Sequence, residues 1–469
     1  MISYSSVSSS VLTTEGRFNP KYLIFLEERN ALLAKASSQI KLLGDKKYFP
    51  VLSDGIHTAV QLDKKGEIRY LYVHSLKEGF IDETDKIFLN ESDHSANKSK
   101  ELRDGDVLLS VVGTLGNAAM VSSYVQKPCS LPRNIAFIRP EQSLVSPSYL
   151  TCFFLSDFAR NQSSFSGGGN VQGLLSLTKL KKLLIFLPPK PIQNEIGGLY
   201  DEAVTLQAKF LEGIFQAVNE LEGILGISDY SRKKYLTYSV KSTDLLRETR
   251  WTPTLFYPMV DEAISAIGER FITHTLGDIA KISKGDEIGS DNYQDIFSKS
   301  NDAIPFARTS DVFNYEVDSY PDFWASSDIY EELDQDFHAG DVVVNNDGRI
   351  GFPAMLTDAD KAIYQSHIRS LRSKMPKKFS NEYIFLCLLS PLLGEMQFRK
   401  YTVIQSTIPT LGNRLARFKI PEISKEDHDR LSIVIRDAYG LIARKKSIVK
   451  QIRSSINLMI HEAEQVNKQ

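Results

Sequence analysis

A long internal repeat constrains this chain more than any other feature of its sequence. Residues 105–116 read Gly-Asp-Val-Leu-Leu-Ser-Val-Val-Gly-Thr-Leu-Gly, and Gly-Asp-Val returns at 340–342, followed by Gly348 and Gly351. Both stretches predict a Gly-Asp turn, a short strand, a glycine-punctuated loop and a second strand. Offsets near 233 to 235 also relate Arg17-Phe18-Asn19-Pro20 to Arg250-Trp251-Thr252-Pro253, and Leu187-Pro188 to Ile420-Pro421. A period this long predicts a duplicated domain and not a solenoid.

Length and charge set broad limits on the class of protein. A chain of 469 residues can hold two to three domains, each with its own core. Lys plus Arg is 56 and Asp plus Glu is 58, giving a formal net charge of −2. The absence of a global positive excess argues weakly against a nucleic-acid partner, because binding needs only a local basic face.

The sequence predicts a cytoplasmic protein that does not enter a membrane. The N-terminus has no basic segment before a long apolar stretch, so it is not a secretory signal. The longest apolar run, 383–393, is interrupted by Ser390 and Pro391 and falls short of the ~20 residues of a membrane span. Cys129, Cys152 and Cys387 are scattered, which predicts buried or incidental thiols in a reducing compartment.

The predicted fold class is α+β, with two duplicated domains joined by two long antiparallel helices in a coiled coil with pseudo-twofold symmetry. Within the domains, the patterns predict helices near 17–43 and 148–163, and strands near 68–74, 106–112 and 134–138. The predicted divisions are a flexible arm at 1–16, a first domain at 17–190, a long helix and polar connector at 191–249, a second domain at 250–422 and a C-terminal helix at 423–469.

The two long helices follow from apolar residues that step by three and four. At 1.5 Å per residue, the first spans ~50 Å, and its glycines would leave it marginal alone, so it needs a partner. The two helices are the obvious mutual partners; alternatively, each packs on its own domain. We predict partner-binding side chains along both stripes: Leu199, Leu206, Phe210, Leu221, Leu431, Leu441 and Ile452.

Signatures of catalysis are missing from the sequence. It has no Gly-x-x-x-x-Gly-Lys-Ser/Thr loop, no Gly-x-Ser-x-Gly elbow and no His-Glu-x-x-His. Asn345-Asn346-Asp347 lacks the Pro-Pro-aromatic context of amino-methyltransferases, and the eight histidines show no i, i+4 pairing. We therefore predict a protein that is not an enzyme, with no catalytic residue and no metal site.

Polar residues suited to nucleic acid recur at strand ends and glycine turns in both halves. Arg can contact guanine bidentately, and Asn or Gln can contact adenine. The candidates in the first half are Ser110, Thr114, Arg133, Asn134, Asn170 and Gln172, with Lys179, Lys181 and Lys182 for phosphates. Those in the second half are Arg308, Thr309, Asn345, Asn346, Arg349, Gln365, His367, Gln405 and Ser406. The alternative for any one of them is a turn former or a solvated residue. The loops differ between halves more than their framework does, as expected for readers of two different sequences.

These features resemble the specificity subunit of a type I restriction–modification system over nearly the whole chain. The resemblance rests on Gly-Asp-Val-Leu-Leu-Ser-x-x-Gly-Thr-x-Gly at 105–116 and on Gly169-Asn170-Val171-Gln172. It rests above all on Leu187-Pro188-Pro189-x-x-x-Gln193-x-x-Ile196 opening a long helix. The second half departs from this pattern, with Asn345-Asn346-Asp347-Gly348-Arg349 in the loop and Pro421-Glu422-Ile423-Ser424 opening the helix. We therefore expect the halves to engage their partners differently.

The resemblance implies two target recognition domains, each reading half of a bipartite site in double-stranded DNA. It implies helices that set the separation of the half-sites, two methyltransferase subunits and a restriction subunit as partners, and no active site in this chain. S-adenosylmethionine, and ATP with magnesium for restriction, would belong to those partners. Two alternatives are a non-catalytic adaptor of another defence complex and a catalytic nuclease or methyltransferase subunit.

Overall fold

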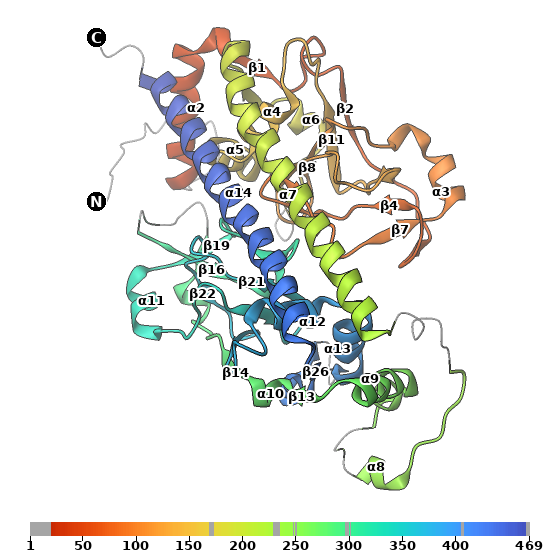
Figure 1. Cartoon of the computed structure of the whole chain (residues 1–469). Helices are drawn as coiled ribbons and strands as arrows, with labels where there is room; N and C mark the ends of the chain where they lie inside the picture. Colours follow the sequence, from red (N-terminus) through yellow and green to blue (C-terminus); the bar gives the residue numbers. More distant parts are fainter. Residues whose placement is uncertain are drawn as a thin grey trace. The chain divides into compact units, whose positions relative to one another are not determined.

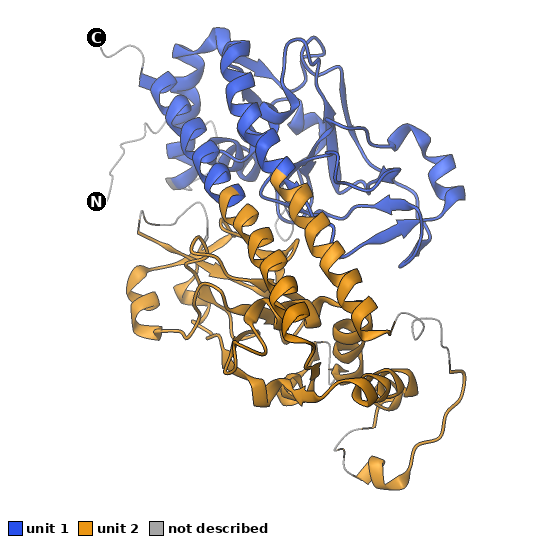
Figure 2. Ribbon diagram, viewed as in Figure 1, with its two compact units in different colours: residues 1–205, 445–469 blue, residues 206–444 orange. Residues whose placement is uncertain are grey.

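The computed structural model describes residues 20–167, 173–227, 235–246, 248, 251–295, 300, 302–404 and 408–465. The chain divides into two compact units, which Figure 2 colours separately: unit 1 is Met1–Thr205 with Lys445–Gln469, and unit 2 is Leu206–Arg444. The boundaries fall inside two long helices, α7 (Lys190–Leu225) and α14 (Lys425–Gln465), so each unit holds part of both (Figure 1). The sequence had placed its divisions at the ends of these helices. None of the described helices is long and apolar enough to cross a membrane.

Unit 1 combines short strands with helices, as an α+β fold requires. Its shorter helices are α2 (Pro20–Lys35), α3 (Glu91–Ala96), α4 (Pro147–Phe154), α5 (Asp157–Ser166) and α6 (Leu177–Leu180). Its strands are β1 (Ile40–Leu42), β2 (Val51–Asp54), β3 (Leu62–Asp63), β4 (Ile68–Tyr70), β5 (Leu76–Lys77), β6 (Phe80–Ile81), β7 (Ile87–Leu89), β8 (Val107–Ser110), β9 (Ala118–Met120), β10 (Cys129–Ser130), β11 (Ile135–Arg139) and β12 (Leu184–Phe186).

Unit 2 has the same kinds of elements. Its shorter helices are α8 (Ser242–Leu246), α9 (Pro258–Arg270), α10 (Leu276–Ile279), α11 (Ser327–Leu333), α12 (Asn381–Leu389) and α13 (Met396–Tyr401). Its strands are β13 (Thr273–Thr275), β14 (Ala280–Lys284), β15 (Gln294–Asp295), β16 (Ile304–Ala307), β17 (Val312–Phe313), β18 (Glu316–Val317), β19 (Phe323–Ala325), β20 (Val342–Asn345), β21 (Gly351–Met355), β22 (Ile363–Tyr364), β23 (Ile368–Ser373), β24 (Val403–Ile404), β25 (Pro409–Thr410) and β26 (Lys419–Pro421).

The strand orders confirm the duplication. One four-stranded sheet runs β2-β11-β8-β9 in unit 1, and its counterpart runs β14-β23-β20-β21 in unit 2. A second sheet runs β3-β7-β4-β10 in unit 1 and β15-β19-β16-β22 in unit 2. In both second sheets the last pair is parallel and the other pairs are antiparallel. The matching hairpins β5-β6 and β17-β18, and the pairs β1-β12 and β13-β26, complete the repeat.

Two helices predicted from the sequence are shorter than expected. The helix predicted at 17–43 ends at Lys35, because Ile40 pairs with Phe186 as the first residue of β1. The helix predicted at 148–163 is two helices, since the Ser156 side chain accepts a hydrogen bond from the Ala159 backbone N–H and caps α5. A strand pairing distant in the sequence overrides helical periodicity in the first case, and a local cap does so in the second.

Within unit 2, the parts of α7 and α14 pack on each other and run antiparallel. Phe210 lies edge-on to Tyr439, with ring centroids 5.2 Å apart, and Glu220 forms an ion pair with Arg430 further along both helices. Contacts that advance along one helix while receding along the other require opposite directions. Both helix parts also belong to the same apolar core as α12 and the β20 strand. The two alternatives weighed from the sequence are therefore combined, because the helices pack on each other and on the domain.

A tyrosine on a long helix anchors the same hairpin turn in each unit. In unit 1, the Tyr200 hydroxyl donates to the Gly79 carbonyl in the turn between β5 and β6. In unit 2, the Tyr439 hydroxyl donates to the Tyr315 carbonyl (2.6 Å) between β17 and β18 and accepts from the Met355 N–H (3.0 Å). Both turns have two residues of positive φ, as in the hairpin turns that suit twisted strands. The repeat thus includes the joint between helix and domain.

Gln193, the polar residue of the helix-opening signature, also has a structural role. Its side chain is buried; the carbonyl oxygen accepts from the Ser146 N–H (3.1 Å), and the amide donates to the Pro188 carbonyl (2.9 Å). Ser146 caps α4. A Cβ at Gly197 would come within 3.0 Å of the Ser146 Oγ, so a glycine allows α7 to approach this cap. The signature therefore fixes the start of α7 on α4.

Candidate nucleic-acid interface

In unit 1, the candidate interface is the loop between β8 and β9 at one end of the four-stranded sheet. The loop turns at Gly113 and Gly116, where φ is +82° and +85°. Ser110 is fully buried at the base; its hydroxyl donates to the Thr114 carbonyl (2.5 Å) and accepts from the Asn117 N–H (2.9 Å). These bonds hold the loop tip outward, with Thr114 exposed.

The neighbouring strand brings two more candidates to the same end of the sheet. Ile135 of β11 pairs with Ser110 of β8, and the Val111 N–H donates to the Asn134 carbonyl (3.0 Å). Arg133 and Asn134 therefore lie beside the glycine loop. Arg133 is exposed and Asn134 is half-buried. Within the described residues, no carboxylate forms an ion pair with Arg133, so its guanidinium is available to an anion or a base edge.

In unit 2, the equivalent loop follows β20 and carries different residues. Its glycines, Gly348 and Gly351, have φ of +73° and +89°. The Asn346 N–H donates to the His367 carbonyl (2.8 Å), which places the start of β23 beside the loop, as in unit 1. The buried Asn345 amide donates to the Thr309 carbonyl (2.9 Å) and adds the segment after β16 to the cluster.

Asp347 and His367 form a polar pair at the centre of this cluster. The carboxylate lies 3.1 Å from the His367 Nδ1. Burial raises the pKa of Asp347, but hydrogen bonds from Thr410, His367 and Asn346 outweigh it and leave the pKa below its ordinary value. Because an ionised carboxylate only accepts, the Nδ1 of His367 carries the proton. The half-exposed ring offers its Nε2 to a ligand.

The two arginines predicted in unit 2 are held against aromatic rings. The Arg349 guanidinium lies 3.8 Å from the Phe352 ring centroid, and its Nη1 donates to the Val312 carbonyl (3.1 Å). The Arg308 guanidinium lies 4.1 Å from the Phe323 centroid, with Asp311 and Asp322 within 4 Å. Gln365 is half-buried and reaches Glu287 at 3.5 Å. Carboxylates thus lie beside Arg308 and Gln365.

Three predicted contact residues must be corrected. Ser110, Asn345 and Asn346 have exposures of 0%, 0% and 1%, so their side chains cannot reach a ligand in this structure. They stabilise the loops through hydrogen bonds in the interior of each unit. Four other candidates, Asn170, Gln172, Gln405 and Ser406, lie outside the described residues. The sequence had not identified Asp347 or Thr410 as parts of the cluster; the run Asn345-Asn346-Asp347 before Gly348 was the available signal.

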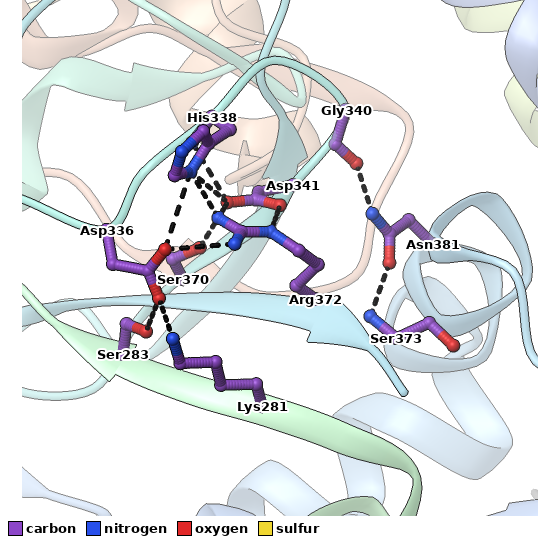
Figure 3. A network of polar contacts seen from close by, with 10 residues as sticks. All are labelled: Lys281, Ser283, Asp336, His338, Gly340, Asp341, Ser370, Arg372, Ser373 and Asn381. Carbon is purple, nitrogen blue, oxygen red and sulfur yellow. Dashed lines mark hydrogen bonds and ion pairs between the residues drawn. The ribbon is translucent and has the colours of Figure 1, made fainter. Parts of the chain in front are cut away.

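Below the loops, the repeated Gly-Asp turn ties the sheet together. In unit 1, Arg139 binds the buried Asp106 carboxylate through two hydrogen bonds of 2.7 Å. In unit 2, Arg372 binds Asp341 in the same way, at 2.8 and 2.7 Å (Figure 3). Such bidentate pairs are the strong form of charge-assisted hydrogen bond. They fix the strands whose far ends carry the candidate loops.

Unit 2 extends this network with a second carboxylate. Figure 3 shows Asp336 facing Arg372 (2.9 Å) and also binding Lys281 and Ser283, both at 2.7 Å. Hydrogen bonds from Lys281, Ser283 and Arg372 hold the pKa of Asp336 well below its usual range. Among the described residues, Arg372 thus has two carboxylate partners, Asp341 and Asp336, whereas Arg139 has one, Asp106.

The helix side chains predicted to bind partners mostly pack inside this chain. Buried ones are Leu206, Phe210, Leu221, Leu431 and Ile452, which corrects their assignment to a surface for another protein. Leu199 and Leu441 are half-buried, and their role stays a prediction.

The three cysteines are free and buried, as predicted, and burial raises the pKa of Cys129 and of Cys387 to about 12. Among the described residues, no group of His, Cys, Asp and Glu is arranged to hold a metal.

Comparison with known proteins supports the resemblance. No family model matches the chain. A putative type I restriction enzyme specificity subunit, S.HindORF215P of Haemophilus influenzae, is 29% identical over 140 residues, which cover 29% of this chain and 33% of the relative. The match thus spans about a third of the relative's length. The chain is similar to a type I restriction enzyme specificity subunit, as its motifs predicted.

Solved structures of similar proteins align over most of the chain. The S subunit of a type I restriction–modification system from M. genitalium covers 91% of this chain and 94% of its own, at 11% identity and a TM-score of 0.30. The HsdS subunit from Thermoanaerobacter tengcongensis covers 90% and 95%, at 15% identity and a TM-score of 0.27.

Proposed function

We propose that this chain is the DNA sequence-recognition subunit of a type I restriction–modification complex, acting in the cytoplasm without catalysing a reaction itself. One observation carries the proposal: the same end of the same sheet presents a glycine-turned polar loop in each unit, with different side chains. Thr114 and Arg133 occupy it in unit 1, and His367 and Arg349 occupy it in unit 2. Two such loops suit two different half-sites of one bipartite site.

The partners in this proposal are double-stranded DNA, two methyltransferase subunits and a restriction subunit. The cofactors belong to those partners: S-adenosylmethionine for methylation, and ATP with magnesium for restriction. This chain would hold none of them. Its contribution is binding energy and sequence choice, since two half-sites bound together gain affinity through effective concentration.

We further propose that the long helices set the spacer between the half-sites. With 36 and 41 residues, they extend ~54 and ~62 Å at 1.5 Å per residue. Removing one turn from each helix at facing positions should shorten the recognised spacer. An unchanged spacer in a folded, active variant would refute this role of the helices.

A methylation map of the host genome by long-read sequencing tests the central proposal. Deleting the gene for this chain should erase one bipartite methylated motif, and restoring the gene should return it. Arg133→Ala should then relax one half of the motif and Arg349→Ala the other, because an arginine–guanine contact is worth roughly 1–3 kcal/mol, or ~10- to 100-fold in discrimination. A map unaffected by the deletion, with the methyltransferase active, would sink the proposal.

A second candidate function, an adaptor of another defence complex, is favoured by the charge of unit 2. Residues 286–347 contain 16 Asp or Glu and 2 Lys or Arg. Such a segment repels phosphates and suits a basic protein partner. The adaptor would show DNA-independent co-purification of partners, and its assembled complex would lack salt-sensitive DNA binding.

A further inference from the structure

Two segments of unit 1 that are far apart in the sequence lie side by side. Strand β1 pairs antiparallel with β12. Beyond the pair, the Leu43 N–H donates to the Leu183 carbonyl and the Gly44 N–H donates to the Lys181 carbonyl, both at 2.9 Å. The tight turn at 45–49 is thereby placed next to helix α6.

The two segments together carry a cluster of lysines, which we call the lysine patch: Lys41, Lys46, Lys47, Lys179, Lys181 and Lys182. Lys46, Lys47, Lys181 and Lys182 are exposed, and Lys41 and Lys179 are half-exposed. In the part of the chain that the structure describes, none of the six forms an ion pair. Asp45 lies within the patch, and its carboxylate accepts from the backbone N–H of Lys47.

Three other lysines of unit 1 contrast with this patch. Lys86 pairs with Glu83 at 2.8 Å, Lys100 lies 3.6 Å from Asp54, and Lys127 pairs with Asp104. Six lysines without carboxylate partners repel one another, and an anion relieves that repulsion. Tyr48 lies between two of them, with the Nζ atoms of Lys41 and Lys47 both 5.5 Å from its ring centroid. The patch is therefore a basic surface whose lysines form no ion pairs among the described residues, and the Tyr48 ring contacts two of these lysines.

One short segment connects the lysine patch to the candidate loop of unit 1. The Gly173 carbonyl accepts from the Gly113 N–H (3.3 Å), and the Leu175 N–H donates to the Val111 carbonyl (2.9 Å). Ser176 then caps α6, which contains Lys179 and leads to Lys181. The same ten residues thus touch the loop at one end and carry lysines at the other.

We propose that the lysine patch binds the phosphate backbone of the duplex whose half-site unit 1 reads. This inference rests on the proposed function, and continuity with the loop selects DNA as the occupant over a lipid surface or an acidic protein. Phosphate contacts fix the position of a protein on the duplex and carry no sequence information. The patch should supply affinity, salt dependence and register, and leave the recognised bases to the loop.

The chain offers a closely matched test. Asp45-Lys46-Lys47 lies in the patch, while Asp63-Lys64-Lys65 is an exposed turn of the same unit, and in both the Asp carboxylate accepts backbone N–H bonds. The variants Lys46→Gln/Lys47→Gln and Lys64→Gln/Lys65→Gln remove the same charge. We would measure binding of the assembled complex to a duplex containing its site, by fluorescence anisotropy over a range of salt concentrations.

The patch variant should make the slope of log K against log[salt] shallower by up to about 1.8, since each phosphate contact contributes about 0.9. The control variant should keep the wild-type slope, and the methylation motif should be the same in both. Equal slopes in all three proteins, or an equal decrease in slope in the two variants, would refute phosphate binding by the lysine patch. Either result would leave the recognition role intact. A wild-type complex without salt-sensitive binding would overturn both.

Discussion

The two long helices begin against the same kind of site but use different residues to do so. At the start of α7, the Gln193 side-chain oxygen accepts from the N–H of Ser146, the capping residue of α4. At the start of α14, the His428 Nε2 accepts from the N–H of Ser380, the capping residue of α12, at 3.0 Å. The signature glutamine missing from the second half therefore has a functional substitute in the structure.

The difference between the joints is chemical. An amide oxygen accepts a hydrogen bond at any physiological pH, whereas an imidazole nitrogen accepts only while it is unprotonated. His428 is buried, with Asp429 at its Nδ1 (3.1 Å) and the Tyr383 ring beside it. The duplication has thus preserved the position of an acceptor and changed the chemical group that supplies it.

Charge separates the two units further. The segment 56–112 of unit 1 contains 11 acidic and 8 basic residues, whereas the equivalent 286–347 of unit 2 contains 16 and 2. In the DNA-binding role proposed above, the more acidic segment of unit 2 would repel phosphates more strongly, so unit 1 would be the better suited to the first encounter with DNA. Unit 2 would depend more on short-range contacts.

The largest difference between the units should appear when the repeated Gly-Asp carboxylate is removed. Asp106→Asn leaves Arg139 without its carboxylate and should lower the free energy of unfolding by about 3 kcal/mol. Asp341→Asn should cost only about 1–2 kcal/mol, because Arg372 keeps Asp336. Urea denaturation, with hydrogen exchange to assign the unit, measures both. Adding Asp336→Asn to Asp341→Asn should bring the unit 2 cost up to that of unit 1; equal costs in the two single variants would break the comparison.

The tyrosine anchors should differ by a smaller amount. Tyr439→Phe leaves the Met355 N–H and the Tyr315 carbonyl without their hydroxyl partner and should cost about 2 kcal/mol. Tyr200→Phe should cost about 1 kcal/mol, because the Gly79 carbonyl keeps the Met120 N–H as a donor. Thermal unfolding of the two variants tests the order. A larger loss of stability for Tyr200→Phe than for Tyr439→Phe would contradict this order.

The smallest expected effect concerns the acceptor at the start of α14. His428→Gln, which copies the residue of unit 1, keeps an acceptor for the Ser380 N–H, whereas His428→Leu leaves that N–H without one. The leucine variant should therefore be less stable than the glutamine variant by about 1 kcal/mol, corresponding to one hydrogen bond. Urea denaturation of both variants measures the difference; equal free energies of unfolding would show that the acceptor does not stabilise this joint.

Much of the framework could be predicted from the sequence, because periodicity and repetition are local signals. The duplication, the bounds of the long helices and the strands before the glycine loops follow from spacing alone. The helix predicted at 148–163 failed at Ser156, since a capping hydrogen bond cannot be distinguished from an ordinary polar residue in an apolar run.

The candidate sites were harder to predict. Residue types selected the loops, whose role stays a prediction, but they could not show that Ser110 and Asn345 are buried, because burial depends on what packs above them. The lysine patch joins Lys41 to Lys181 across a strand pair that no local pattern reveals. The Gln193 and His428 equivalence was hidden because two different side chains accept the same hydrogen bond.

The division of the chain inside its helices has a consequence for synthesis. Unit 2 is one continuous stretch, Leu206–Arg444, whereas unit 1 needs both Met1–Thr205 and Lys445–Gln469. In the last of these, Arg453 donates to the Leu155 carbonyl and Asn457 accepts from the Asp157 N–H. A ribosome delivers these residues after all of unit 2. Unit 1, whose synthesis begins first, is therefore completed after unit 2. Its surface around Leu155 and Asp157, which the end of α14 contacts, stays uncovered while unit 2 is synthesised.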